Sequence, residues 1–361
     1  MRDLILQLSK SSIYSTKPIN HYKDVVDNLT PREIITNPLG SINQFQGAAK
    51  DLADELDYLK GKTARATAGA GLAVSIPNDV LSVAFMAKGY AHGRVSSSID
   101  QQDIDYLRRI QRSNVVAAGV ALDAALNGTD QITKNLNSTA SGRAAIVSDY
   151  GVAVARQFDL GGVPVSVGVT PKLQKTWVYN YTTSIYDYDS NKWNDSRYRT
   201  DDTGFNVDAG IAADFGEHWT VGVSGQNLMS RDIDTKDIRI RNGRTGEVVS
   251  YKDTYQIRPL VTAGAAWHND LVTLTADGDL TETKGFKSED TSQYVGVGAE
   301  VTPLSWLAVR AGYRADVKGN DSNVFTGGVG FAPFSTVHVD LMGLYGEDET
   351  WGAGAQLSMT F

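Results

Sequence analysis

Charged side chains recur at alternate positions through the second half of the sequence, where strand side chains of one face would lie. These residues are Lys172, Asp208, Arg258, Asp277, Asp279, Glu300, Arg310, Arg314, Asp316, His338 and Asp340. Charges of both signs on one enclosed face can form a salt-bridge network that fills and stiffens an interior. They can equally form a selectivity filter or guide a substrate. The sequence leaves both interpretations open.

The closest pair of carboxylates in this set lies in the stretch "DGD" at 277–279. Two carboxylates on one face suggest either a calcium site or an acid/base pair. Calcium needs about six to eight oxygen ligands, of which this pair supplies only a fraction. No GxSxG or comparable nucleophile motif is present, and the chain has no cysteine. We therefore predict no metal, no cofactor and no catalytic residues.

The elements that must position these charges are strands with one apolar and one polar face. In "FNVDAGIAADF" (205–215), apolar side chains alternate with small or polar ones, a pattern typical of half-exposed strands. This pattern predicts strands at 64–76, 80–95, 142–158, 164–181, 204–215, 218–228, 254–267, 271–281, 291–302, 305–316, 323–332, 334–345 and 350–361.

The connections between these strands alternate between short and long. Short ones lie at 159–162, 215–218, 268–270, 302–305 and 332–335, and long ones at 182–203, 229–253, 282–290, 317–322 and 346–349. Trp219, Trp267 and Trp306 lie beside short turns, whereas Trp177 and Trp351 lie towards long loops. This layout is typical of a transmembrane β-barrel with aromatic side chains at both membrane interfaces.

Thirteen predicted strands are one short of the even number with which a bacterial barrel closes. The segment 3–14, with Leu4, Leu6 and Leu8 in alternation, is the only candidate for the missing strand. The predicted fold class is therefore all-β: a single transmembrane antiparallel β-barrel of about 14 strands that comprises the whole chain, 1–361, with its main strands in 64–361.

Helical insertions are expected within this barrel. The stretch 41–62 has an apolar helical face, so 15–63 is predicted to be a helical insertion or a plug. A second helix is expected at 97–111, with Ser98 or Asp100 as its N-cap, inside a long, partly helical loop at 96–141.

Two local features point to the membrane. Phe361 ends the last apolar stripe, and a terminal aromatic residue of this kind is predicted to be the insertion signal that barrel-assembly machinery recognises. In "GQNL", Gly225, Gln226 and Asn227 predict a strand kink, either a simple irregularity or a lateral exit to the bilayer. The start lacks the apolar core of a signal peptide, although an outer-membrane location in a Gram-negative envelope is predicted.

Several stretches resemble the TraF-like conjugal-transfer family of outer-membrane proteins, itself similar to FadL/TodX-type channels. They are "GVTPKLQ" (168–174), "GQNLMSRDIDT" (225–235), "RPLVTAGAAW" (258–267), "TLTADGDLTETKGF" (273–286), "WLAVRAGYRAD" (306–316) and "GAGAQLSMTF" (352–361). The resemblance implies a 14-stranded barrel, with or without a plug, that transports small, hydrophobic molecules or takes part in conjugal transfer.

The expected partners follow from this interpretation. They are outer-membrane lipid, the barrel-assembly machinery, and a small hydrophobic ligand or detergent in the lumen. The formal net charge of −8 argues against nucleic acid. The alternative function is a non-transporting structural or adhesive barrel that binds a partner through its extracellular loops. A soluble, lipocalin-like protein is disfavoured by the two bands of tryptophan.

Overall fold

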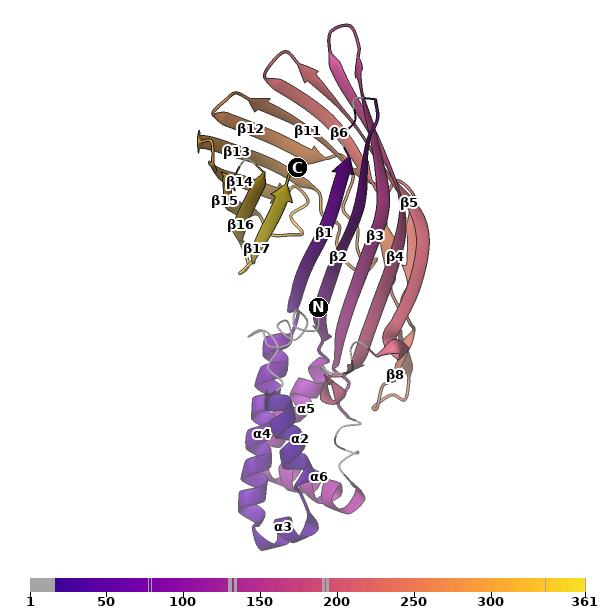
Figure 1. The fold of residues 1–361 in the computed structure, drawn as a ribbon. Helices are drawn as coiled ribbons and strands as arrows, with labels where there is room; N and C mark the ends of the chain where they lie inside the picture. Colours follow the sequence, from indigo (N-terminus) through magenta and orange to yellow (C-terminus); the bar gives the residue numbers. More distant parts are fainter. Residues whose placement is uncertain are drawn as a thin grey trace.

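A computed structural model describes residues 17–76, 78, 80–128, 132, 135–189, 192, 195–334 and 336–360. Its main feature is one antiparallel sheet of thirteen strands, in which each strand pairs with its neighbours in chain order. The strands are β1 (Thr63–Ile76), β2 (Ser82–Ser98), β3 (Thr139–Asp159), β4 (Pro164–Ser184), β5 (Arg199–Phe215), β6 (Trp219–Gln226), β11 (Leu260–His268), β12 (Val272–Asp279), β13 (Tyr294–Leu304), β14 (Leu307–Asp316), β15 (Val324–Phe334), β16 (Val337–Gly346) and β17 (Trp351–Met359). Figure 1 shows that this sheet curves strongly from β1 to β17.

The thirteen strands predicted from alternation are confirmed, with one correction. The predicted strand 254–267 is two elements, because the chain leaves the sheet register at Arg258 and Pro259. Proline has no amide hydrogen to donate to a ladder, and it also restricts the residue before it. The part before the break, β10 (Thr254–Ile257), pairs with β7 (Arg231–Asp234) and not with the large sheet.

The two edges of the sheet run in the same direction. No ladder joins β1 to β17 within the described residues. Both strands run from the end with long connections towards the end with short turns. Two neighbouring strands of a meander run in opposite directions, so these edges cannot continue the antiparallel order by pairing with each other. The predicted strand 3–14 and the predicted signal Phe361 lie outside the described residues.

The α-helices of the described residues form a bundle beyond the long-connection end of the sheet, as Figure 1 shows. They are α2 (Lys17–Asp27), α3 (Pro31–Thr36), α4 (Pro38–Leu59), α5 (Gln101–Arg112) and α6 (Asn114–Asn127), with short 3₁₀ turns η1 (Ile185–Asp187) and η2 (Ser196–Tyr198) in the loop after β4. Tyr22, Phe45, Leu52 and Leu107 are buried in its apolar core. The bundle therefore has its own core.

The helices predicted from sequence are present, and further ones were missed. The predicted helix 41–62 corresponds to α4, and 97–111 corresponds to α5, whose N-cap is Asp100. The side chain of Asp100 accepts a hydrogen bond from the amide of Gln102. Of the missed helices, α6 is apolar on all sides, so it lacks the amphipathic period that reveals a helix in sequence. No helix in the described part of the chain combines the length and apolar character needed to span a membrane.

The long connection between β6 and β11 folds back against the sheet. It contains β7 and β10 and a hairpin of β8 (Ile238–Arg241) and β9 (Val248–Tyr251). Residues 283–289 join the β7–β10 pair, because the amide of Gln256 donates to Gly285 and that of Lys287 donates to Thr254. We call β7, β10 and residues 283–289 the inner segment. It lies against the face of the large sheet that carries Lys172 and Asp208, which we call the inner face.

Candidate functional site: the inner face and its covering segment

The inner segment packs on the inner face through an apolar contact. Its buried side chains are Ile233, Tyr255, Ile257 and Phe286, and the wall contributes Ala145 and Val147 from β3, Val178 from β4 and the half-buried Tyr90 from β2. The rings of Tyr255 and Phe286 meet edge to face, with centroids 5.3 Å apart. Burial of this kind contributes roughly 1.5–3 kcal/mol for each large side chain. The contact therefore holds the segment in place in the absence of any covalent link.

Ion pairs surround this apolar contact. Arg143 of β3 lies 2.9 Å from the Asp253 carboxylate and 2.6 Å from the Ser288 hydroxyl. His92 of β2 lies 2.9 Å from the Glu289 carboxylate. Burial alone would raise the pKa of Glu289, but the hydrogen bond and charge of His92, together with the charge of Arg94, hold that pKa below its usual range. The segment is thus joined to two wall strands by charges.

A fully buried ammonium group lies beside the start of the β6–β11 connection. Lys172 of β4 has no exposed side-chain surface, and its Nζ lies 2.9 Å from Asp149 and 2.8 Å from Asp208. Lys88, which is one-third exposed, lies 3.6 Å from Asp208. Lys172 and Asp208 were predicted from sequence to lie on the inner face, whereas Asp149 was not. The alternation within 142–158 could have placed Asp149 on the inner face, but only the strand register brings it to Lys172.

The predicted kink at Gly225, Gln226 and Asn227 coincides with the end of β6. Asn227 has a positive φ of 53°, and its amide donates to Asp208 at 2.8 Å. Leu228 crowds the outer side, since a Cβ on Gly225 would lie 2.8 Å from the Leu228 side chain. The chain therefore turns from the sheet into the inner segment at a point fixed by the Lys172–Asp208 pair.

A second charged group crosses the strands β13 to β16 further along the inner face. Arg310 lies between two carboxylates and forms ion pairs with both Glu300 and Asp340. The intervening strand offers Gly328 and Gly330, which leave room for the long side chain. A Cβ on Gly330 would lie 2.6 Å from Asp340 and 3.2 Å from Arg310. Arg310 is thus paired with one inward carboxylate on each side, as in the salt-bridge interpretation of these charges.

Replacing Gly330 with valine should break the Arg310–Asp340 pair, because the added atoms would occupy the space of the two charged groups. We expect a loss of about 1–3 kcal/mol in unfolding free energy, as for other overpacked sites. Gly327, in the same strand on the other face, has nothing within 4 Å of its Cβ position and supplies the matched control. Equal unfolding free energies for the two valine variants in denaturant titrations would contradict this account.

The remaining predicted residues have separate surroundings. Arg258 pairs with Asp232 next to the inner segment, and its guanidinium donates to the Arg231 carbonyl at 3.1 Å. The other charges lie further along the sheet. Arg314 stacks on the Tyr294 ring at 4.4 Å, Asp279 accepts a hydrogen bond from Thr262, and His338 is exposed opposite Ser358. The charges on the inner face thus form several local groups, and no cluster of metal ligands occurs among the described residues.

An open hollow remains on the inner face, nearer the short turns than the inner segment. It has a volume of about 610 Å³ and is lined by Gly210, Gly222, Ser224, Gly264, Thr275 and Asp277, among others. Small side chains at these inward positions leave the space empty. This part of the inner face can hold a small molecule, with Asp277 as its charged group.

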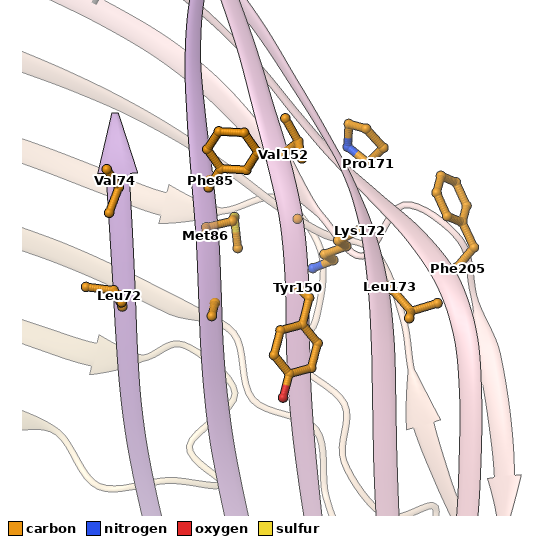
Figure 2. A pocket seen from close by; sticks show the side chains of 12 residues that line it. Leu72, Val74, Phe85, Met86, Tyr150, Val152, Pro171, Lys172, Leu173 and Phe205 are labelled. Atoms are coloured by element: carbon orange, nitrogen blue, oxygen red, sulfur yellow. The ribbon is translucent and has the colours of Figure 1, made fainter. Parts of the chain in front are cut away.

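A second hollow lies on the outer face, as Figure 2 shows. Its volume is about 530 Å³, and it is lined mainly by apolar side chains that include Leu72, Phe85, Tyr150, Leu173 and Phe205. It lies where the β3–β4 ladder is interrupted beside Pro171, because proline cannot donate a ladder hydrogen bond. This hollow could not be predicted from the alternation of residues, since it depends on which strands are neighbours.

Residues 11–279 match the family described as "F plasmid transfer operon, TraF, protein". The chain belongs to this family. The match confirms the resemblance predicted from the sequence stretches. It includes the helices α2 to α6 and the strands β1 to β12, among them the inner strands β7 and β10, whereas the Glu300–Arg310–Asp340 group lies beyond it. No curated protein matches the sequence.

Solved structures similar to this TraF-family chain include hydrocarbon channels. The toluene transporter TbuX of Ralstonia pickettii is 10% identical, with a TM-score of 0.44, and the match covers 82% of this chain and 90% of that one. The toluene transporter TodX of Pseudomonas putida is 10% identical, with a TM-score of 0.43 and coverage of 82% and 86%. The CymD monoaromatic hydrocarbon channel is 10% identical, with a TM-score of 0.43 and 91% of both chains covered.

Proposed function

We propose that this TraF-family protein is an outer-membrane β-barrel whose inner segment gates the passage of small molecules. The observation that carries the proposal is the position of the inner segment, which covers the inner face through an apolar contact ringed by ion pairs. A segment held only by noncovalent contacts can be displaced. On the same face, nearer the short turns, the hollow that contains Asp277 offers space for a small molecule.

The outer face supports a membrane environment. Large apolar side chains are exposed there from β1 to β17, and they include Leu72, Phe205, Ile211, Val297, Phe325, Leu341 and Leu357. Trp219 lies opposite Trp267 at the short-turn ends of β6 and β11, with Trp306 in the turn between β13 and β14. Trp177 and Trp351 lie towards the other end. Two such bands are what lipid–water interfaces favour.

The parallel edges β1 and β17 support closure by one additional strand. That strand must run opposite to both edges, from the short-turn end to the long-connection end. The segment 3–14 precedes α2, which lies in the helical bundle at the long-connection end. Its alternation of Leu4, Leu6 and Leu8 matches the outer face of the sheet. We assign this segment as the fourteenth strand on those grounds.

The closing strand is tested on SDS gels with and without heating. We expect unheated full-length protein to migrate differently from heated protein, because a closed barrel resists SDS while cold. Deleting residues 3–14 should abolish the shift. Leu6→Asp should weaken it more than the neighbouring Gln7→Asp, since only Leu6 would face lipid. A shift that survives the deletion would contradict closure by this segment.

Phe361 is assigned as the signal read by the barrel-assembly machinery. Changing it to serine should lower the amount of barrel assembled in the outer membrane several-fold. It should change the unfolding of already folded protein by only about 1–3 kcal/mol, the scale of one lost apolar side chain. Thr360→Ala serves as the neighbouring control. Normal assembly of the Phe361 variant, measured in isolated outer membranes, would refute the signal.

The proposed cargo is small and hydrophobic, because the hollow on the inner face is lined mostly by small side chains and Asp277 is the one charged residue among the described residues that line it. A second candidate function is a structural or adhesive role in plasmid transfer, which the family description suggests. The helical bundle that projects beyond the sheet favours this second role. Liposome flux with a sugar and with an aromatic hydrocarbon separates the two, since a purely structural barrel would pass neither.

A further inference from the structure

The helix α6 has two apolar faces but only one of them is covered. Ala117, Ala121 and Ala124 are buried in the core of the helical bundle. On the opposite side, Val115 is 83% exposed and Leu126 is 67% exposed. A helix that is apolar on all sides is normally buried on all sides. Among the described residues, the exposed side of α6 therefore has no apolar partner.

The exposed positions form a line along the helix. Val115, Gly119, Leu122 and Leu126 follow one another at intervals of four, three and four residues. This is the spacing of the seam along which two helices pack. At Gly119, nothing lies within 4 Å of the position a Cβ would occupy. The line thus presents large side chains on both sides of an open gap.

We propose that a second copy of this chain covers the line, with the two α6 helices packed antiparallel about a two-fold axis. In that arrangement Val115 lies opposite Leu126 of the other copy. Leu122 enters the gap over Gly119 of the other copy. The two-fold axis generates each of these contacts a second time, with the roles of the two copies exchanged. A two-fold interface must be self-complementary. Both contacts meet this condition, because each joins one residue of the line to a different residue of the same line in the other copy.

The charges of α6 are compatible with this pairing. Asp123 is the only charged residue of the helix, and it lies beside the line, where its side chain stays hydrated. Antiparallel helices also place opposite ends of their dipoles together, which is favourable. The neighbouring helix α3 contacts α6 and adds the exposed Ile35, and α4 begins close by with the exposed Leu39. These two residues extend the apolar surface around the helix pair.

The contact is expected to be weak in dilute solution. A helix of fourteen residues is about 21 Å long, and one such face buries less than the roughly 800 Å² per partner of a stable interface. Confinement of both copies to one membrane raises their effective concentration. We therefore infer a reversible dimer whose population rises with protein density.

Single cysteines test this register directly, because the chain has none of its own. Purified full-length Val115→Cys and Leu126→Cys variants are reconstituted at high density, separately and mixed, and treated with a short bismaleimide. The mixture should give crosslinked dimer several-fold above either variant alone. Two Val115 positions would lie about 16 Å apart along the axis, so neither variant should crosslink to itself. Val248→Cys, exposed on the β8–β9 hairpin, measures random collision.

Two further variants test the fit in the crosslinking mixture. Adding Leu122→Asp or Gly119→Leu to both partners should return the yield to that of Val248→Cys, and the heat-dependent gel shift shows that the barrel remains folded. Several results would overturn the proposal. One is self-crosslinking of Val115→Cys, which would indicate parallel helices. Another is a yield of crosslinked dimer in the mixture that is no higher than that of Val248→Cys. Binding of the exposed line to lipid vesicles in place of a second copy would also overturn it.

Discussion

Replacing residues 227–259 with an Asn-Gly turn should raise the single-channel conductance in planar bilayers at least several-fold. The replacement is feasible because Gln226 of β6 and Leu260 of β11 are register partners, and Asn-Gly suits a two-residue hairpin. It removes β7 and β10, and with them Ile233, Tyr255 and Ile257, from the inner face. Residues 283–289 lose β10, the strand to which they are hydrogen-bonded.

A smaller deletion gives the matched control for this experiment. Shortening only the tip of the β8–β9 hairpin, residues 242–247, leaves β7 and β10 in place. It should therefore leave the conductance unchanged, although it removes the Arg244–Asp103 ion pair to the helical bundle. Both variants must keep the heat-dependent gel shift of a folded barrel. A folded replacement variant that conducts like the full chain would show that the inner segment does not obstruct passage.

Changing Lys172 to methionine should lower the unfolding free energy by about 3–5 kcal/mol. The change removes the buried cation that lies closest to the carboxylates of Asp149 and Asp208, and leaves them only the partly exposed Lys88 at 3.8 and 3.6 Å. Removing one partner of a buried ion pair is strongly destabilising. The effect is measured by denaturant unfolding in detergent. We also expect higher leak conductance, because Asp208 would no longer hold Asn227 at the start of the inner segment.

Two comparisons distinguish the buried ion pair from a general loss of charge. Lys88→Met should cost only about 0.2–1 kcal/mol, because the Lys88 side chain is 34% exposed and water screens its interactions. Adding Asp149→Asn and Asp208→Asn to the Lys172 variant should restore part of the stability, since neutral groups remove the unpaired charges. Equal losses for the two lysine variants would contradict the role given to Lys172.

Much of the large sheet could be predicted from the sequence because each strand faces two different environments. In β5, for example, Phe205 is exposed on the outer face while its neighbour Asn206 is buried on the inner face. The alternation of apolar and polar residues along the sequence follows from this difference between the two faces. Connection lengths then predict which strand ends lie together. The Glu300–Arg310–Asp340 group follows from the same reasoning, because alternation places the three charges on one face, and strand order places Glu300 on the strand next to Arg310 and Asp340 on the next strand but one.

The inner segment could not be predicted by this reasoning. Ile233, Tyr255 and Phe286 come from short stretches that look like loops or like the start of an ordinary strand. Their burial depends on a return of the chain to β2, β3 and β4, which are distant in sequence. Asp149 was missed for a related reason, since its partner is defined by register. Pro259 was the one local signal, and it marks the end of β10 inside the predicted strand 254–267.

Tethering the inner segment to the wall tests whether this segment must move for molecules to pass. Asn180 of β4 lies 3.4 Å from the Thr235 hydroxyl, just after β7. An Asn180→Cys/Thr235→Cys variant is therefore suited to a short bifunctional thiol reagent. Flux of a small aromatic hydrocarbon into liposomes should fall several-fold after crosslinking but remain unchanged after a monofunctional reagent. Undiminished flux through the fully crosslinked protein would contradict a gate at this position.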